Sequence, residues 1–260
     1  MIKFTKVAST NRSAPMLLLI PGGPGLSSLT LRSLDILKRS FELQYVDFPG
    51  TNGVPYERDR TFKELGAELA AEVARLGRPV FALGHSFGGI FAADLALRSS
   101  SVRGIACVAT PLSMRSLEAA GPRFQESKSP ALVAAEERFY SNPSDETFAE
   151  WLAEYEGLYF SSATRAAGRE LLRRDPSSAK FFQNNRKDAV LMEPLLTKLA
   201  SWDGKKLFIA GGQDGLLVSS ILKYDAATAQ AKFIEIPEGN HFVTFDQPES
   251  VARAIEEIFV

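Results

Sequence analysis

The sequence predicts an α/β fold in which a mostly parallel sheet is flanked by helices and carries an inserted helical cap. Two observations support this prediction. Short apolar runs alternate with longer stretches of helical periodicity, which is typical of βαβ units. Residues 111–201 break the alternation, because they contain several helical patterns and no convincing strand. A chain of 260 residues is long enough for one such domain with an insertion.

Six short apolar runs are expected to form the sheet. The run at residues 16–20 is apolar throughout, as strands buried on both faces are. The other predicted strands are residues 43–47, 80–83, 105–109, 206–210 and 232–236. Helical patterns lie at residues 27–39, 61–76, 87–98, 216–228 and 248–259. This order assigns residues 1–110 and 202–260 to the core domain.

The predicted cap, residues 111–201, begins just after a predicted strand. In open α/β sheets the loops at the carboxyl ends of the strands surround the active site, so this insertion is placed to act as a lid. The insertion is rich in aromatic side chains, namely Phe124, Phe139, Tyr140, Phe148, Trp151, Tyr155, Tyr159, Phe160, Phe181 and Phe182. We expect most of them to form the core of the cap itself.

Composition and charge narrow the class of protein. A formal net charge of -1 produces no overall field that would attract nucleic acid or an anionic membrane. The single cysteine, Cys107, cannot form an internal disulfide and lies in a predicted buried strand. The N-terminal residues lack the apolar stretch of a signal peptide. We therefore expect a cytoplasmic protein without nucleic-acid or membrane partners, and the oligomeric state is left open.

The segment Gly84-His85-Ser86-Phe87-Gly88 lies between a predicted strand and a predicted helix. In that context the pattern G-x-S-x-G is typical of a nucleophile elbow, which holds its serine on a sharp, strained turn. Side chains at the two glycine positions would collide with the turn. The alternative is a glycine-rich connection with a bystander serine, and the rest of the chain argues against it.

A serine hydroxyl is a weak nucleophile near neutral pH and needs a base within hydrogen-bond reach. The chain has only two histidines. His85 leaves the elbow in a different direction from Ser86, so it is not expected to be the base. His241 follows the strand predicted at residues 232–236 and is the expected base. A surface imidazole is the alternative interpretation of His241.

The base needs an acidic partner that orients it. In folds with this elbow the acid lies between the serine and the histidine in the chain. Asp214 directly follows the strand predicted at residues 206–210, so it is the expected acid, although an aspartate in such a loop can also serve as a turn or helix cap. Asp203 and Asp246 are weaker candidates, because neither directly follows a strand.

A Pro/Gly loop, residues 21–25, follows the first predicted strand. Attack on a carbonyl group creates an oxyanion that must meet preorganised donors. The backbone N–H of Phe87 is one expected donor. Gly23 is the other, because Pro24 has no N–H and glycine leaves room for substrate. Taken alone, the loop could equally be a plain turn.

These four segments in this order resemble the α/β-hydrolase superfamily over essentially the whole chain. The matching segments are residues 22–25, 84–89, 212–214 and 239–242. The resemblance implies acyl transfer through a covalent acyl-Ser86 intermediate, with His241 as base and then acid and Asp214 as its orienting partner. It implies no cofactor and no metal. A serine at the elbow is unlike the dehalogenase and epoxide hydrolase branches, which use aspartate there.

Within the superfamily, residues 22–25 are similar to the His-Gly-Gly-Pro-Gly loop of proline iminopeptidases. Those enzymes remove an N-terminal residue and hold the free amine of the substrate with glutamates in the cap. Residues 151–157 are similar to a cap segment that carries one such glutamate, which maps to Glu156. Tyr159 and Phe160 share the helical side of Glu156. A solvated surface carboxylate is the alternative.

Two positions depart from the iminopeptidase pattern. Pro21 stands where that family has histidine, and residues 181–185 supply no second glutamate, for which Glu136 and Glu137 are possible substitutes. The sequence thus predicts a serine hydrolase, an aminopeptidase of the proline iminopeptidase type acting on a small molecule or short peptide. Two alternatives stay open. One is a carboxylesterase, lactonase or thioesterase on a small apolar acyl substrate, and the other is a non-catalytic binding protein.

Overall fold

The computed structural model describes residues 1–11, 13–186 and 192–260. Its centre is a seven-stranded sheet in the order β1-β3-β2-β4-β5-β6-β7. The strands are β1 (Lys3–Val7), β2 (Met16–Ile20), β3 (Glu42–Asp47), β4 (Val80–His85), β5 (Val102–Val108), β6 (Lys205–Gly211) and β7 (Lys232–Ile236). β1 pairs antiparallel to β3, and all other neighbouring strands pair parallel. The six predicted strands and the mostly parallel sheet are confirmed.

β1 is the strand that the apolar runs of the sequence do not predict. Its sequence, Lys-Phe-Thr-Lys-Val, has no continuous apolar run, and both lysines are exposed. β1 lies at the edge of the sheet and contacts only β3. An antiparallel edge strand with one solvated face needs no continuous apolar run, so its signal in the sequence is weak.

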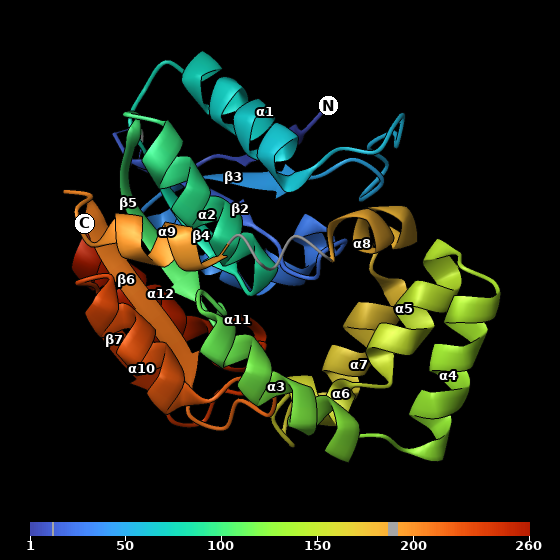
Figure 1. Cartoon of the computed structure of the whole chain (residues 1–260). Coiled ribbons are helices and arrows are strands. Elements are labelled where there is room, and N and C mark those ends of the chain that lie inside the picture. The colour runs from blue at the N-terminus through green and yellow to red at the C-terminus, as the bar shows by residue number, and fades with distance from the viewer. Residues whose placement is uncertain (12, 187–191) are drawn as a thin grey trace.

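Helices cover both faces of the sheet (Figure 1). They are η1 (Ser28–Arg39), which has 3₁₀ hydrogen bonding, α1 (Phe62–Arg75), α2 (Phe87–Arg98), α10 (Ser219–Thr228), α11 (Val243–Asp246) and α12 (Pro248–Phe259). Along β2, Leu18 and Ile20 pack with α1 and α2, whereas Leu17 and Leu19 pack with η1 and α12. Successive side chains of a strand point to opposite faces. Burial on both faces therefore explains the unbroken apolar run.

A group of helices forms a separate layer beyond the carboxyl ends of the strands (Figure 1). They are α3 (Met114–Glu126), α4 (Pro130–Ser141), α5 (Asp145–Ala153), α6 (Glu156–Tyr159), α7 (Arg165–Arg174) and α8 (Ala179–Asn185). Phe139, Phe148 and Trp151 are buried at its centre, and the rings of Phe139 and Trp151 stack at 5.1 Å. Many of the aromatic residues of the insertion thus pack with one another, in a cluster that continues into the core domain through Leu216 and Phe242.

The end of the predicted cap interval behaves differently. α9 (Met192–Leu199) packs against α2, and its residues Leu196 and Leu199 belong to the core beneath α2. Residues 187–191 of the interval lie outside the described residues. We propose that the cap comprises α3 to α8 and that α9 belongs to the core domain. Within the described ranges, no helix has the length and apolar character needed to cross a membrane.

Candidate active site

Ser86 lies at the sharp turn between β4 and α2, with φ 51° and ψ -121°. A Cβ atom on Gly84 would lie 2.2 Å from the carbonyl oxygen of Gly88, and one on Gly88 would lie 2.3 Å from the carbonyl oxygen of Ile20. Only glycine fits at either position. The strand–turn–helix context that the sequence predicted for this serine is present.

The structure brings the three predicted residues of the catalytic triad together. The Nε2 atom of His241 lies 3.1 Å from Ser86 Oγ, and its Nδ1 atom lies 3.1 Å from Asp214 Oδ2. His241 and Asp214 are both buried. A proton on Nδ1, facing the carboxylate, leaves Nε2 free to accept the proton of the serine hydroxyl.

Asp214 is held by the loop that carries it. Its second oxygen, Oδ1, accepts hydrogen bonds from the backbone N–H groups of Leu216 and Leu217, both at 2.8 Å. The turn-capping role and the orientation of His241 are therefore performed by different oxygens of one carboxylate. Of the weaker candidates, Asp203 is exposed and Asp246 accepts from the backbone N–H of Asn240 instead.

Asn240 anchors the loop of His241, a role that the sequence did not reveal. Its Oδ1 accepts from the backbone N–H groups of Gly215 and His241, both at 2.7 Å. Its Nδ2 donates to the carbonyl oxygen of Phe160 in the cap, at 2.9 Å. The only available signal was its position next to His241, because its other two partners, Gly215 and Phe160, lie far away in the chain.

His85 supports the same loop from the other side. Its Nε2–H donates to the backbone carbonyl of His241 at 2.9 Å. Complete burial, with His241 nearby, lowers the pKa of His85 to about 3, so the ring is neutral. His85 makes no contact that would let it act as the base for Ser86, as its place in the elbow predicted.

The Pro/Gly loop lies directly against the elbow. A Cβ atom on Gly22 would lie 3.1 Å from the Cβ atom of Ser86. Gly23 has φ 112°, a conformation that favours glycine, and it lines the same cavity as Ser86. Among the described residues, no acceptor pairs with the amide N–H of Gly23 or of Phe87. Both donors remain free in this structure to meet an oxyanion.

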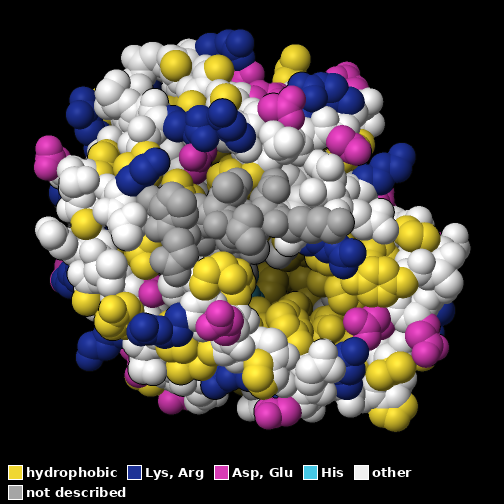
Figure 2. Space-filling view, viewed as in Figure 1, with side chains coloured by type: hydrophobic (Ala, Val, Ile, Leu, Met, Phe, Trp, Pro, Cys, Tyr) yellow, Lys and Arg dark blue, Asp and Glu magenta, His cyan; other side chains and the backbone are white. Residues whose placement is uncertain are grey.

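The triad opens into a cavity of about 350 Å³ between the core and the cap. In the space-filling view its wall is mostly hydrophobic (Figure 2). The apolar and aromatic lining residues are Pro24, Leu26, Phe124, Trp151, Leu152, Tyr155, Tyr159, Leu172, Phe182, Leu216 and Phe242. Lys128 and Glu136 add one ion pair, with Nζ and Oε2 2.9 Å apart. The cavity suits a small, largely apolar group.

Glu156 is not one of the described residues that line this cavity. Its Oε2 atom lies 3.2 Å from Nε of Arg169, which also binds Glu154. Of the two suggested substitutes, Glu136 lines the cavity and Glu137 is exposed outside it. Within the described ranges, no group of three or more His, Cys, Asp or Glu side chains is arranged to hold a metal ion.

Comparisons with known proteins agree with this architecture. The model of the alpha/beta hydrolase family matches residues 17–254. No curated protein sequence matches the chain significantly.

Several solved structures are similar in fold. A thermophilic esterase from Thermogutta terrifontis is 20% identical with a TM-score of 0.75, covering 98% of this chain and 92% of its own. An enol-lactonase from Burkholderia xenovorans is 15% identical with a TM-score of 0.72, covering 98% and 95%. A putative aryl esterase from Burkholderia cenocepacia is 16% identical with a TM-score of 0.74, covering 98% and 93%. With the family match over nearly its whole length, the chain belongs to the alpha/beta hydrolase family.

Proposed function

We propose that the protein is a serine hydrolase that cleaves carboxylic esters or lactones with a small, largely apolar acyl group. The observation that carries this proposal is the hydrogen-bonded chain from Asp214 through His241 to Ser86, which ends in the wall of an apolar cavity. The names of three structural neighbours, two esterases and an enol-lactonase, support the same reaction class.

The proposed reaction uses this chain's own residues in two steps. His241 Nε2 accepts the proton of Ser86 as Oγ attacks the ester carbonyl, and the N–H groups of Gly23 and Phe87 stabilise the oxyanion. The protonated His241 then donates its proton to the departing alcohol. Water, deprotonated by His241, releases the acid from Ser86. These steps need no metal and no cofactor.

The aminopeptidase predicted from the sequence has less support than the ester-cleaving alternative. Binding of a free amine needs a carboxylate that faces the cavity and is available to a cation. Glu156 instead pairs with Arg169, and Glu136 pairs with Lys128. We therefore propose the esterase or lactonase as the function of this site, with a small-molecule substrate.

The first test combines active-site labelling with matched substrates. We expect a fluorophosphonate probe to label the wild type and not Ser86→Ala. We also expect p-nitrophenyl esters to turn over, with kcat lowered in Ser86→Ala by a factor on the order of 10⁶. Free-amine and N-acetylated prolyl and alanyl p-nitroanilides serve as the comparison. Turnover confined to the free-amine anilides would contradict the esterase and restore the aminopeptidase.

A further inference from the structure

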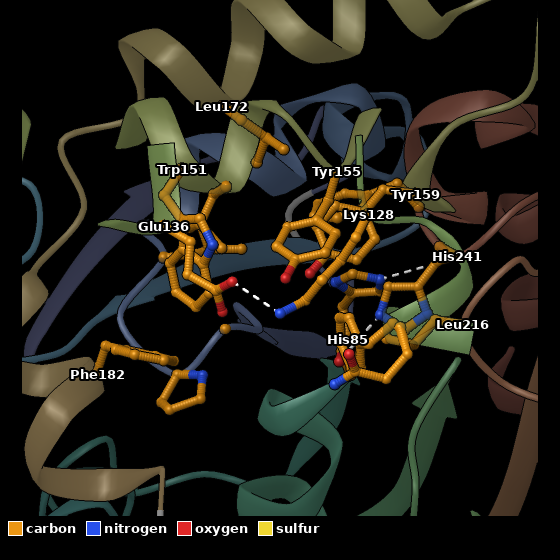
Figure 3. Close-up of a pocket in the computed structure, with 18 residues that line it drawn as sticks. His85, Lys128, Glu136, Trp151, Tyr155, Tyr159, Leu172, Phe182, Leu216 and His241 are labelled. Atoms are coloured by element: carbon orange, nitrogen blue, oxygen red, sulfur yellow. Dashed lines mark hydrogen bonds and ion pairs between the residues drawn. The ribbon is translucent and has the colours of Figure 1, made fainter. Parts of the chain in front are cut away.

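Lys128 and Glu136 place a paired positive and negative charge in the wall of the cavity that holds Ser86 and His241. Lys128 lies in the loop between α3 and α4, and Glu136 lies on α4. Their side chains are 32% and 25% exposed, so both are partly withdrawn from solvent. Figure 3 shows them pointing toward each other across the cavity, with Trp151 and Tyr155 nearby.

These two residues carry the fixed charges among the described side chains that line the cavity. Burial is the main cause that raises the pKa of Tyr155 to about 12, and Glu136 contributes. Burial also raises the pKa of Tyr159. Both phenols are therefore neutral near neutral pH. The cavity combines an apolar wall with one ion pair whose charges sum to zero.

The pair favours some chemical groups over others. An ammonium group has three N–H donors, and the described contacts of Lys128 Nζ use one, toward Glu136. A neutral oxygen acceptor can take another donor while the pair stays intact. A carboxylate on the substrate is attracted by Lys128 but repelled by Glu136, and the reverse holds for a cation. The intact pair therefore offers no net attraction that would offset the cost of desolvating a charged group in the apolar cavity.

We propose that Lys128 binds a second oxygen acceptor on a neutral ester, and that the Lys128–Glu136 pair selects against charged substrates. This inference rests on the proposed ester-cleaving function. The substrate class is a neutral ester or lactone that carries, besides the reacting carbonyl, a keto, ether or hydroxyl oxygen within reach of the cap. Lys128 is then a specificity-determining residue, and Glu136 sets the charge balance around it.

The test compares kcat/KM for p-nitrophenyl esters of matched medium-chain acyl groups. The acyl chains end in a methyl group, carry a keto oxygen at successive positions, or end in a carboxylate or a trimethylammonium group. For the wild type we expect one keto position to exceed the plain chain by about tenfold, which is the lower range for a hydrogen bond from a charged donor. The esters with either charged chain should have a lower kcat/KM than the esters with neutral chains.

The two variants should shift this selectivity in opposite directions. Lys128→Met should lose the keto preference and favour the trimethylammonium chain by about tenfold relative to wild type. Glu136→Gln should favour the carboxylate chain by a similar factor. The matched control is Glu150→Gln, which breaks the Arg138–Glu150 ion pair inside the cap, away from the cavity. Its selectivity should equal that of wild type.

Either of two results would overturn the inference. One is a wild type that prefers a charged chain over the neutral ones. The other is unchanged selectivity in both Lys128→Met and Glu136→Gln, with normal thermal unfolding. Failure of fluorophosphonate labelling in the wild type would instead remove the proposed function. Labelling with flat selectivity would remove this inference alone.

Discussion

Among single residues, Ser86 is held in a backbone conformation that an L residue rarely adopts. Strain of this kind amounts to roughly 1–3 kcal/mol and persists only where the surroundings enforce it. Here the N–H of Ser86 donates to the carbonyl of Val108, and its own carbonyl accepts from Gly89. The pattern of glycines made this turn predictable, because the two glycines and the serine lie within five consecutive residues between a strand and a helix.

His85 is a positioning residue for His241, and its replacement should lower activity. His85→Phe keeps an aromatic ring next to Phe242 but removes the N–H that donates to the carbonyl of His241. An unpaired buried carbonyl costs about 1–3 kcal/mol, and the base loop loses one of its anchors. We expect kcat on a p-nitrophenyl ester to fall about tenfold, with KM nearly unchanged. A raised KM at normal kcat would mean that His85 shapes the cavity instead.

Among the elements, the loop after β7, the loop after β6 and the cap segment after α6 form one hydrogen-bonded unit. Asn240 joins all three, and Asp246 accepts from Asn240 and from the backbone N–H of Ser161. The N–H of Phe242 also donates to the carbonyl of Tyr159 at 2.9 Å. The cap is thus attached to the active site next to the proposed base.

Removal of the Asn240 side chain should weaken this hydrogen-bonded unit. Asn240→Ala leaves the N–H groups of Gly215 and His241 and the carbonyl of Phe160 without this partner. We expect the free energy of unfolding in urea to fall by about 3 kcal/mol, and fluorophosphonate labelling to slow. The control is Asn142→Ala, at an exposed position after α4. Equal stability of the two variants would contradict the stabilising role of Asn240 in this unit.

Elements differed in how well the sequence predicted them. Strands buried on both faces, such as β2, carry a continuous apolar run that needs no knowledge of their neighbours. β1 lacks such a signal because it is an edge strand. α9, which we propose belongs to the core domain, has the same helical pattern as the cap. Whether an amphipathic helix covers the cap or the sheet depends on the partner it meets, which local sequence does not encode.

In the whole molecule, the cap is docked on the core beside the Pro/Gly loop. Asp175, between α7 and α8, accepts from both the backbone N–H and the hydroxyl of Ser27. The N–H of Ser178 donates to the carbonyl of Gly25 at 2.8 Å. Burial is the main cause that raises the pKa of Asp175 to about 6, and the nearby Asp47 raises it further. A buried carboxylate therefore sits at the contact between cap and core.

This placement predicts how stability depends on pH. Asp175 holds its proton in the folded state up to about pH 6, whereas an unfolded aspartate has a pKa near 3.8. The folded state binds more protons between these values, so the contribution of Asp175 to stability is lost as pH rises from about 4 to 6. This difference between the folded and unfolded pKa of Asp175 corresponds to about 3 kcal/mol in the free energy of unfolding.

Asp175→Asn removes this titration and keeps a side chain of the same shape. The free energy of unfolding of both proteins is measured in urea at several pH values. Between pH 4 and pH 7, the free energy of unfolding of the variant minus that of the wild type should rise by about 3 kcal/mol. Any loss from weaker hydrogen bonds to Ser27 should be the same at every pH. If the free energies of unfolding of the two proteins differ by the same amount at every pH, the pH dependence does not come from Asp175.

The sequence by itself determined the parts whose physics is local. The order of strands and helices follows from apolar periodicity. The elbow, Asp214 and His241 were each found as a chemically required residue at the end of a predicted strand. The carboxyl ends of parallel strands meet at one edge of the sheet, so chain order alone predicted that these residues would come together.

Tertiary structure alone decided which charged groups face the cavity. Glu156 and Glu136 are both cap glutamates, and their local sequences do not separate an amine ligand from a partner in an ion pair. Packing of the cap helices places Arg169 beside Glu156 and brings Lys128 and Glu136 into the cavity wall. Such contacts depend on how helices are oriented against one another. The residues of the proposed substrate preference therefore lie in the cap, while those of the proposed reaction lie at the strand ends.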